Sequence, residues 1–529
     1  MIGSILKNIS AAIITLVVVI GCQKKEEVGI NPYEGGKEPF GIFFTSNLAD
    51  PTSALPGEVV RINVKGLKQY ESKFDFRLND VKTEIVALTD STLDFRIPNE
   101  VSSGIVTVIL NGQIFYGPRV GVEGKVSVDT DYKIVNGFNG SVQGILPHAG
   151  GHIVVGDFTN FENELTSGAY MTGIHFINSL GQTANNMDFR RRANTGISSI
   201  VRLSDGKFII GGYFSSFSKR DVAGIARLNA NGSLDTMTVA VINPNSATKP
   251  LDGIDTVSTL NAGFTNGSVS KVFEAPNNGI YVVGSFNNYR SIDYQYSSRE
   301  NRRYINTRVS SVARLKENGT LDSSFNFQNT GLNGFINDAV CLKDGRLVIV
   351  GSFTNYNGTS VRNIVCIKPD GKVDESFIAN GGANQAIRSI TYNPTLNTLA
   401  LAGTFTNYAG VNNSGVVILN DNGAVDQSFT LGDLDGEFPT YAYKLSNGKI
   451  LVIGSFLRYN NVRRGGILIL EADGTAKQEY NNLGAFSGIP LTLVETTSSL
   501  GNPAILLGGL IFSVDGKSVG NIVKIEIKN

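Results

Sequence analysis

The sequence predicts an all-β protein in which a β-propeller of seven repeats follows a smaller β-sandwich. The first observation is a Gly-x-Phe signature that recurs about every fifty residues, a spacing typical of propeller blades. The second is the turn dipeptide Asp-Gly, which stands between short apolar runs. The third is an alternation of apolar and polar residues before the repeats begin. The signature starts at Gly156, Gly212, Gly284, Gly351, Gly403 and Gly454, and a weaker seventh copy ends at Phe512.

The composition fits an ordered protein without a global charge. Of the 529 residues, 41% are hydrophobic, which is ample for a packed core and argues against a disordered chain. Lys+Arg and Asp+Glu are equal at 46 each, so we expect no nucleic-acid partner and no basic field toward anionic lipid.

Residues 1–21 have the features of a signal peptide. Lys7 supplies the positive charge, and the apolar run from Ala11 to Ile20 is too short to cross a bilayer as a helix. Gly21 and Cys22 resemble the lipobox of bacterial lipoproteins. The resemblance implies that the Cys22 thiol is lipidated, whereas the alternative is a plain secretory signal with an incidental cysteine.

Residues 22–39 are polar and rich in Gly and Pro, which is typical of a flexible tether. The run Cys22-Gln-Lys-Lys-Glu-Glu also resembles the acidic export tag of Bacteroidota surface lipoproteins. The tag would imply a lipid-anchored protein of the outer membrane that faces the cell exterior. A solvated linker would have the same composition.

Residues 40–124 are expected to form a sandwich of short strands separated by Gly, Pro and Asn-Asp breaks. This segment resembles the immunoglobulin-like IPT/TIG domain, and the resemblance implies a spacer or stalk without site chemistry. It is carried by Pro56-Gly57, VVRINVKGL, Arg96-Ile97-Pro98, Gly104 and VTVIL.

Each repeat is expected to hold four short strands. In the fourth copy these are residues 336–342, 346–353, 363–367 and 372–377. Asp-Gly joins the first strand to the second and the third to the fourth, because glycine accepts the positive φ of tight hairpin turns. The second and third segments are apolar at successive positions, which is typical of strands covered on both faces.

The recurring side chains are predicted to be structural. The repeated Phe is expected to fill the gap between neighbouring blades. Asp322, Asp374 and Asp426 recur in the ending of the repeat, where a short carboxylate is expected to accept backbone N–H bonds at a turn. Cys341 and Cys366 lie in apolar runs and are predicted to be buried thiols, with a disulfide between them as the alternative.

Residues 125–529 resemble the delta-60 repeat β-propeller, a bacterial repeat of unknown function. The resemblance is carried by Gly-x-Phe, an Asn-Tyr-x-Gly-like loop, an apolar strand and the ending Asp-Gly-x-x-Asp-x-Ser-Phe. The seventh copy lacks this ending, and residues 125–139 look like an unattached fourth segment. We therefore expect 126–138 to pair beside 521–528 and to close a ring of seven blades, which protects strand edges.

Strand parity predicts where a site would lie. With four antiparallel strands per blade, the loops between the second and third strands share a face with the connections between repeats. We call it the loop face, and we call the opposite face, which carries the Asp-Gly turns, the turn face. The long insertions 240–268 and 287–306 fall on the loop face, where a rigid scaffold usually carries its binding residues.

The insertion 287–306 is rich in tyrosine and arginine. We predict Tyr294, Tyr296, Arg299 and Tyr304 as ligand-binding residues, because tyrosine stacks on sugars or peptides and arginine forks to carboxylates. A surface loop packed on a neighbouring blade would have the same composition. No metal site, cofactor site or catalytic residue is predicted, since HExxH, a nucleophile elbow and a P-loop are missing from the sequence.

These observations favour a binding or scaffolding protein. The resemblance to Bacteroidota surface lipoproteins implies an accessory role beside a SusC/SusD-type nutrient importer, with a glycan or a peptide as ligand. The alternative is a propeller hydrolase or lyase that acts on an extracellular polymer. Such an enzyme would need acids or bases that converge on the loop face.

Overall fold

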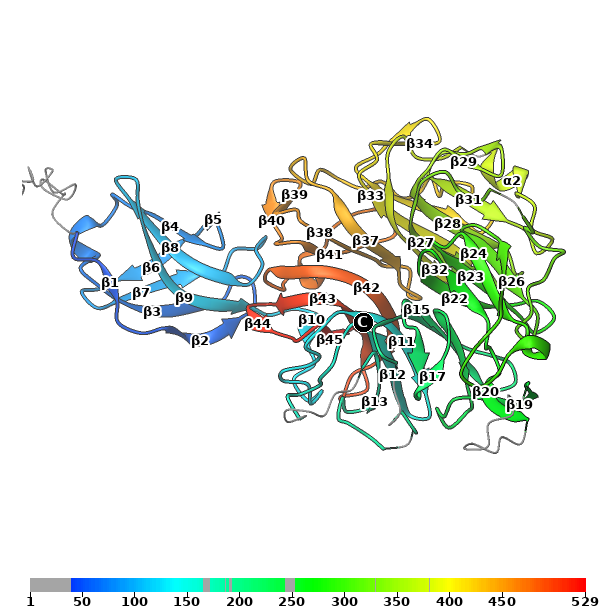
Figure 1. Ribbon diagram of the computed structural model, residues 1–529. Helices are drawn as coiled ribbons and strands as arrows, with labels where there is room; N and C mark the ends of the chain where they lie inside the picture. Colours follow the sequence, from blue (N-terminus) through cyan, green and yellow to red (C-terminus); the bar gives the residue numbers. More distant parts are fainter. Residues whose placement is uncertain are drawn as a thin grey trace, which may run out of the picture.

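The computed structural model describes residues 40–164, 172–185, 187–189, 193–242, 253–328, 330–379 and 381–529. Within these ranges nearly all regular structure is β-strand (Figure 1), so the all-β prediction is confirmed. No helix of the described part is long and apolar enough to cross a membrane. The predicted signal peptide, the tether and Cys22 lie outside the described residues.

The first nine strands form one sheet with the order β5-β4-β8-β9-β2-β3-β7-β6, and β1 pairs with β3. Strand β2 joins its two halves, because it pairs in parallel with β9 and antiparallel with β3. Phe76 of β4 and Phe95 of β7 meet with their ring centroids 5.0 Å apart, so the halves pack face to face. The strands are β1 (Phe43–Phe44), β2 (Leu48–Ala54), β3 (Val59–Lys65), β4 (Asp75–Leu78), β5 (Val81–Lys82), β6 (Ile85–Leu88), β7 (Thr92–Arg96), β8 (Gly104–Leu110) and β9 (Gln113–Val122), with the 3-10 helix η1 (Lys68–Tyr70) after β3.

Seven further sheets follow, each built on three antiparallel strands from one stretch of the chain. The first six comprise β11 (Val142–His148), β12 (Gly151–Gly156) and β13 (Ile174–Asn178); β14 (Ile197–Arg202), β15 (Phe208–Gly212) and β18 (Ile225–Leu228); β22 (Val269–Ala275), β23 (Gly279–Gly284) and β26 (Val312–Leu315); β27 (Phe335–Cys341), β28 (Leu347–Ser352) and β31 (Ile364–Ile367); β32 (Ile387–Asn393), β33 (Thr398–Gly403) and β36 (Val416–Asn420); β37 (Pro439–Lys444), β38 (Ile450–Gly454) and β41 (Ile467–Leu470). The last comprises β42 (Phe486–Thr497), β43 (Pro503–Val514) and β45 (Ile522–Ile527), to which β10 (Val126–Val128) and β44 (Lys517–Ser518) are added.

The first strands of these sheets contact one another in a cycle. The order is β11, β14, β22, β27, β32, β37 and β42, and β42 contacts β11 again. The repeated Phe lies buried between neighbouring sheets, as predicted, and the six residues are Phe158, Phe214, Phe286, Phe353, Phe405 and Phe456. The weaker seventh copy differs, because Phe512 is exposed.

Shorter strands decorate the edges of the sheets. Most lie in the loop between the second and third strands of a repeat, and the 236–308 region adds two extra ladders. These strands are β16 (Ser216–Phe217), β17 (Arg220–Asp221), β19 (Thr236–Ala240), β20 (Ile254–Ser258), β21 (Gly263–Thr265), β24 (Asn288–Ile292), β25 (Tyr304–Arg308), β29 (Asn355–Tyr356), β30 (Thr359–Ser360), β34 (Asn407–Tyr408), β35 (Val411–Asn412), β39 (Arg458–Tyr459) and β40 (Val462–Arg463). The short helices here are η2 (Tyr294–Tyr296), α2 (Glu375–Ile378) and η3 (Gln478–Tyr480).

The predicted fourth strand of the repeat is wrong in its length. In the fourth repeat only Val373 forms a bridge, to Ile367, and the chain then enters α2. The same single bridge occurs at Thr183, Leu234, Leu321 and Val425. The reason is local: the Asp374 carboxylate accepts a bond from the Ser376 hydroxyl at 2.6 Å, and such short-range bonds compete with a strand ladder.

The N-terminal and C-terminal strands meet as predicted. Strand β10 pairs antiparallel with β45, and Val126 stands opposite Ile527. Farther along, the Phe138 amide donates to the Gly520 carbonyl at 2.8 Å, in a turn rather than in a ladder. The last sheet is therefore completed by the segment that precedes the first repeat.

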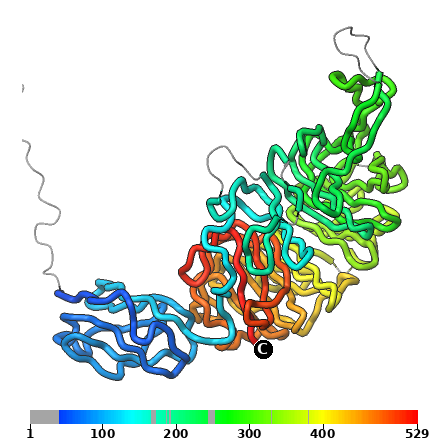
Figure 2. Tube along the Cα trace, turned by 90° about the horizontal axis from the view of Figure 1, so that it is seen from below, coloured from blue at the N-terminus to red at the C-terminus, as the bar shows by residue number. Residues whose placement is uncertain are grey.

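The N-terminal sheet docks directly on the sixth and seventh sheets of the cycle, and Figure 2 shows the blue part of the chain beside the orange and red part. Arg464 is 2% exposed and donates to Glu100 at 2.7 Å. Asn482 donates to the Val122 carbonyl at 3.0 Å, and the Ser103 amide donates to the Asn482 carbonyl at 2.9 Å. We call these contacts the junction.

Candidate functional site

Each of the seven innermost strands contains a β-bulge, which lies near the start of the first six strands and in the middle of β42. The pairing with the second strand slips there by one residue, which leaves one residue of the first strand unpaired. Bulges turn a side chain away from the direction that the pleat would give it. The unpaired residues are Gln143, Ser198, Ser270, Asn337, Arg388, Thr440 and Leu491.

All seven bulge residues line one pocket of about 580 Å³, which we call the central pocket. It lies at the loop face, because the bulges sit where the connections between repeats enter the innermost strands. Thr404, which follows β33 on the same face, also lines it. The volume falls within the range of about 300–1,000 Å³ that is usual for small-molecule sites. A second cavity of about 260 Å³ continues between the same strands and is lined by Tyr441 and Tyr443.

Two of the three charged residues that line the central pocket pair with each other, and the third does not. Lys271 Nζ lies 2.9 Å from Asp338 Oδ1, and Asp338 also accepts the Ile390 amide at 3.2 Å. These bonds tie the third, fourth and fifth sheets together around the pocket. Arg388 is exposed and has neither a salt bridge nor a hydrogen bond from its side chain to any described residue.

Sequence reasoning missed the central pocket. The signal, seen in retrospect, is a polar residue directly after an apolar one near the start of six innermost strands, as in Ile197-Ser198 and Ile387-Arg388. The seventh strand has Leu491 at this position. A polar residue in a short strand usually reads as solvent-facing, so the pattern alone does not point to a shared pocket.

The two predicted insertions lie together in the described part of the chain. The Ile242 amide donates to the Ser297 carbonyl at 2.8 Å, and Arg299 Nε donates to the Ile254 carbonyl at 2.7 Å. Arg302 pairs with Asp255, and both side chains are mostly buried. Residues 243–252 lie outside the described ranges.

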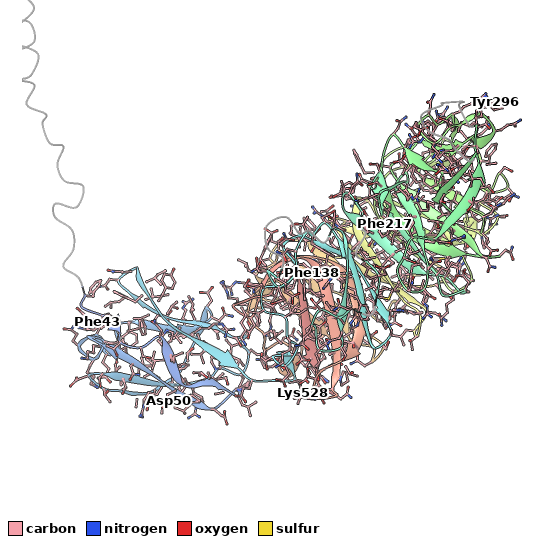
Figure 3. All side chains as sticks on the ribbon, turned by 60° about the horizontal axis from the view of Figure 1, so that its bottom comes forward. Phe43, Asp50, Phe138, Phe217, Tyr296 and Lys528 are labelled. Atoms are coloured by element: carbon pink, nitrogen blue, oxygen red, sulfur yellow. The ribbon has the colours of Figure 1, made fainter. Side chains whose placement is uncertain are left out.

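The four candidate residues of the insertion have different surroundings. Tyr294 is half-buried, and burial raises its pKa to about 12. The Arg299 guanidinium is engaged by the Ile254 carbonyl. Tyr296 and Tyr304 are 55% and 42% exposed, and Tyr296 marks the end of the molecule far from Phe43 in Figure 3. None of the four lines the central pocket.

Arginines of the same insertion cover the two exposed rings. The Arg303 guanidinium lies 4.7 Å from the centre of the Tyr296 ring, and Arg290 lies 4.3 Å from that of Tyr304. These are cation–π distances. A ligand that stacks on either ring would therefore share it with an arginine or displace that arginine.

The first part of the insertion belongs to the core. Tyr289, at its start, is buried beside Phe264 and Phe286, and its hydroxyl donates to the Gly319 carbonyl at 2.6 Å. Strand β24 also pairs with both β21 and β25. The part of the insertion outside the core is the segment between β24 and β25, residues 293–303.

The recurring aspartates are bonded as turn residues, as predicted. Asp322 and Asp426 accept the backbone amides of Ser324 and Ser428 at 3.0 Å. Each aspartate also carries an ion pair that the sequence did not reveal. The pairs are Arg314 with Asp322 at 2.7 Å, Arg346 with Asp374 at 3.1 Å, and Lys444 with Asp426 at 3.0 Å.

Cys341 and Cys366 are free thiols, so the alternative of a disulfide between them is wrong. Burial raises the pKa of each thiol to about 12. A thiol with so high a pKa is protonated at neutral pH and is a poor nucleophile or metal ligand. Among the described residues no group of three His, Cys, Asp or Glu side chains is placed to hold a metal ion.

The strand pattern and the central pocket define a β-propeller. Residues 16–118 match the model of a domain of unknown function, DUF5008. No curated protein matches the chain. Five stretches match the model described as a domain of unknown function (DUF5122) beta-propeller, namely 203–236, 303–325, 342–377, 397–429 and 445–476.

Several solved structures are similar to the chain at low identity. The WD40 β-propeller domain of Doa1 is 13% identical, with a TM-score of 0.39, 76% of this chain covered and 96% of that one. An auxiliary nutrient binding protein from Bacteroides thetaiotaomicron VPI-5482 is 11% identical, with a TM-score of 0.33 and coverage of 93% and 99%. An auxiliary nutrient binding protein from Bacteroides ovatus ATCC 8483 is 10% identical, with a TM-score of 0.26 and coverage of 91% and 89%.

Proposed function

We propose that this chain is a ligand-binding protein of the bacterial cell surface, which captures glycans or peptides on the loop face of its propeller. The observation that carries the proposal is the central pocket, where seven unpaired bulge residues meet. Seven strands supply one residue each, so a ligand there would contact the whole ring. This is the same broad role that two of the similar structures carry in their names.

The architecture that we propose is a closed ring of seven blades, residues 125–529, on an immunoglobulin-like domain, residues 40–124. The cyclic contacts among the innermost strands support the ring. The two face-to-face halves of the first sheet support the immunoglobulin-like domain. We further propose a signal peptide at 1–21, a tether at 22–39, lipidation at Cys22 and an outer-membrane location.

The insertion 287–306 is proposed as a second contact region on the loop face. Tyr296 and Tyr304 would meet the partner, while Tyr294 and Arg299 hold the segment against the other insertion. The partner is a glycan, a peptide or a subunit of a SusC/SusD-type importer. Binding without turnover is proposed, and it is supported by the engagement of Asp338, the one carboxylate among the residues that line the pocket, with Lys271.

The test is a glycan and peptide array probed with the full chain, beside a hydrolysis screen of the same ligands. Ser270→Trp fills the central pocket, and Ser204→Trp places the same side chain on the turn face, between β14 and β15. We expect array binding to be lost in the first variant and kept in the second, without turnover. Thermal melting checks that both variants fold, and Ser198→Tyr provides a smaller filling of the pocket.

Either of two results would overturn the proposal. One is binding that Ser270→Trp and Ser198→Tyr both leave unchanged. The other is the release of products from an array ligand, which would point to the hydrolase or lyase.

A further inference from the structure

The central pocket contains an unpaired positive charge. Its charged lining residues are Lys271, Asp338 and Arg388, and the first two neutralise each other at 2.9 Å. Arg388 is left with its guanidinium exposed and free of any described partner. Asp157 of the loop face, which bonds to the pocket residue Gln143, is occupied: it accepts bonds from Gln143 at 3.0 Å and from the Tyr213 hydroxyl at 2.6 Å.

Three hydroxyl groups of the pocket are also unused. Ser198 and Ser270 make no side-chain hydrogen bond to a described residue, although both line the pocket. Ser389 is 6% exposed, and its Oγ is buried without a partner in the described part of the chain. A buried polar atom without a partner costs free energy, so its presence beside an open pocket points to a ligand or solvent that completes it.

One side of the pocket is apolar. Ile489, Pro490 and Leu491 of β42 supply it, and Ile489 is exposed. The only aromatic residue of the lining is Tyr441, which is buried. The lining therefore has no exposed aromatic ring on which a ligand could stack.

We propose that the central pocket binds an acidic sugar, a small ring that carries one carboxylate and several hydroxyls. Arg388 would hold the carboxylate in a forked pair. The hydroxyl groups of Ser198 and Ser270 and the side-chain amide oxygen of Asn337 would bond to the hydroxyls of the sugar. The apolar side of the pocket would cover the carbon face of the sugar ring. This inference rests on the proposed function of the same pocket and names its ligand class.

The experiment is isothermal titration calorimetry of the full chain with matched sugars. Glucuronate and galacturonate are compared with glucose and galactose, which carry a hydroxymethyl group in place of the carboxylate and are otherwise the same. We expect the uronates to bind about tenfold or more tightly than the neutral sugars, because a charge-assisted pair is worth that ratio. The difference should shrink as salt is raised, since ions screen an open site.

Arg388→Gln should remove this preference and leave weak binding of both kinds of sugar. The matched control is Arg362→Gln, an exposed arginine that lies in the loop after β30 on the same face and does not line the pocket. Arg388→Lys should restore part of the preference, because it restores the charge but not the fork. Circular dichroism and thermal melting confirm folding.

The outcomes separate this inference from the proposed function. Neutral sugars or peptides that bind as tightly as uronates, and whose binding Ser270→Trp abolishes, overturn the acidic-sugar inference alone. Uronate binding that Arg388→Gln leaves intact also overturns it. The absence of any ligand for the pocket overturns both.

Discussion

At the scale of single residues, the recurring aspartate shows how a turn residue becomes part of an ion pair. Asp374 accepts the Ser376 hydroxyl at 2.6 Å and lies 3.1 Å from Arg346. Burial by itself would raise the pKa of the Asp374 carboxyl, but the bonds from Ser376 and Arg346 outweigh it and lower the pKa. Asp322 and Asp426 show the same balance and the same direction.

These pKa shifts predict that the propeller loses stability in acid. A carboxyl whose pKa is lowered by folding stabilises the protein above its unfolded pKa of about 3.9, and the stabilisation is lost as the pH falls through the folded value. Urea denaturation should give a smaller free energy of unfolding near about pH 3 than near about pH 6. Asp374→Asn should lower that free energy by roughly 1–3 kcal/mol at the higher pH and by less at the lower one.

Asp370→Asn is the control for this prediction. Asp370 is 53% exposed and stands in the same repeat, 4.0 Å from Lys372. Its substitution should change stability little at either pH. An effect of Asp374→Asn that is the same at both pH values would contradict the assignment of the shift to this carboxyl.

The turn role of Asp374 could be predicted from the sequence, whereas its cationic partner could not. The spacing Asp-x-Ser is local, so the short bond to Ser376 follows from the chain itself. Arg346 stands on another strand and reaches Asp374 only through the folding of the sheet. For the same reason the sequence could not predict that Arg388 has no carboxylate partner among the described residues, because this depends on which strands the fold places beside it.

At the scale of elements, turns and buried strands could be predicted, and bulges could not. Gly345 and Gly371 adopt φ of +82° and +84°, as the Asp-Gly turns require. The apolar runs became β28 and β31, which are buried almost throughout. The bulges lie instead in the first strands, which are only partly buried, so a polar bulge residue looks like the solvent-facing half of an ordinary alternation.

Strand β10 is expected to be essential to the propeller. Deletion of 126–138 would remove the partner of β45 and expose the edge of the last sheet, which promotes unfolding or aggregation. Size-exclusion chromatography and thermal melting would detect the loss. An intact monomer with an unchanged Tm would show that the ring does not depend on this strand.

The insertion is expected to be separable from the fold once β24 and β25 are kept. Ile292 and Tyr304 stand opposite each other, so residues 293–303 can be replaced by Asn-Gly to make a tight hairpin. We expect the Tm to stay close to that of the parent chain. Array binding should be weaker in this variant than in the parent chain, because Tyr296 is removed, and binding as strong as that of the parent would contradict a contact role for the insertion.

At the scale of the whole molecule, the order of parts could be predicted, and their arrangement could not. Figure 3 shows Phe43 and Tyr296 at opposite ends, with the propeller between them. The junction joins residues far apart in sequence, such as Glu100 and Arg464. No local pattern announces such a pair, because each residue alone is an ordinary surface charge.

Lipidation at Cys22, as proposed above, predicts where the protein is found in the cell. Cys22→Ala should move the protein from the membrane fraction to the soluble fraction, because acyl chains hold a protein by about 0.8 kcal/mol for each buried CH₂. Fractionation followed by immunoblotting measures this. Cys341→Ala is the control, since that thiol is part of the propeller, and retention of Cys22→Ala in the membrane would contradict lipidation there.

The junction also determines how the molecule tumbles in solution. Since Arg464, Asn482 and Ser103 bond across it, residues 40–529 should rotate as one elongated body with a single set of correlation times. Arg464→Ala combined with Asn482→Ala should weaken the junction and let the N-terminal strands reorient more, although the three residues between β9 and β10 keep them attached. Fluorescence anisotropy decay of a dye placed near Phe43 would then gain a fast component that the parent chain lacks.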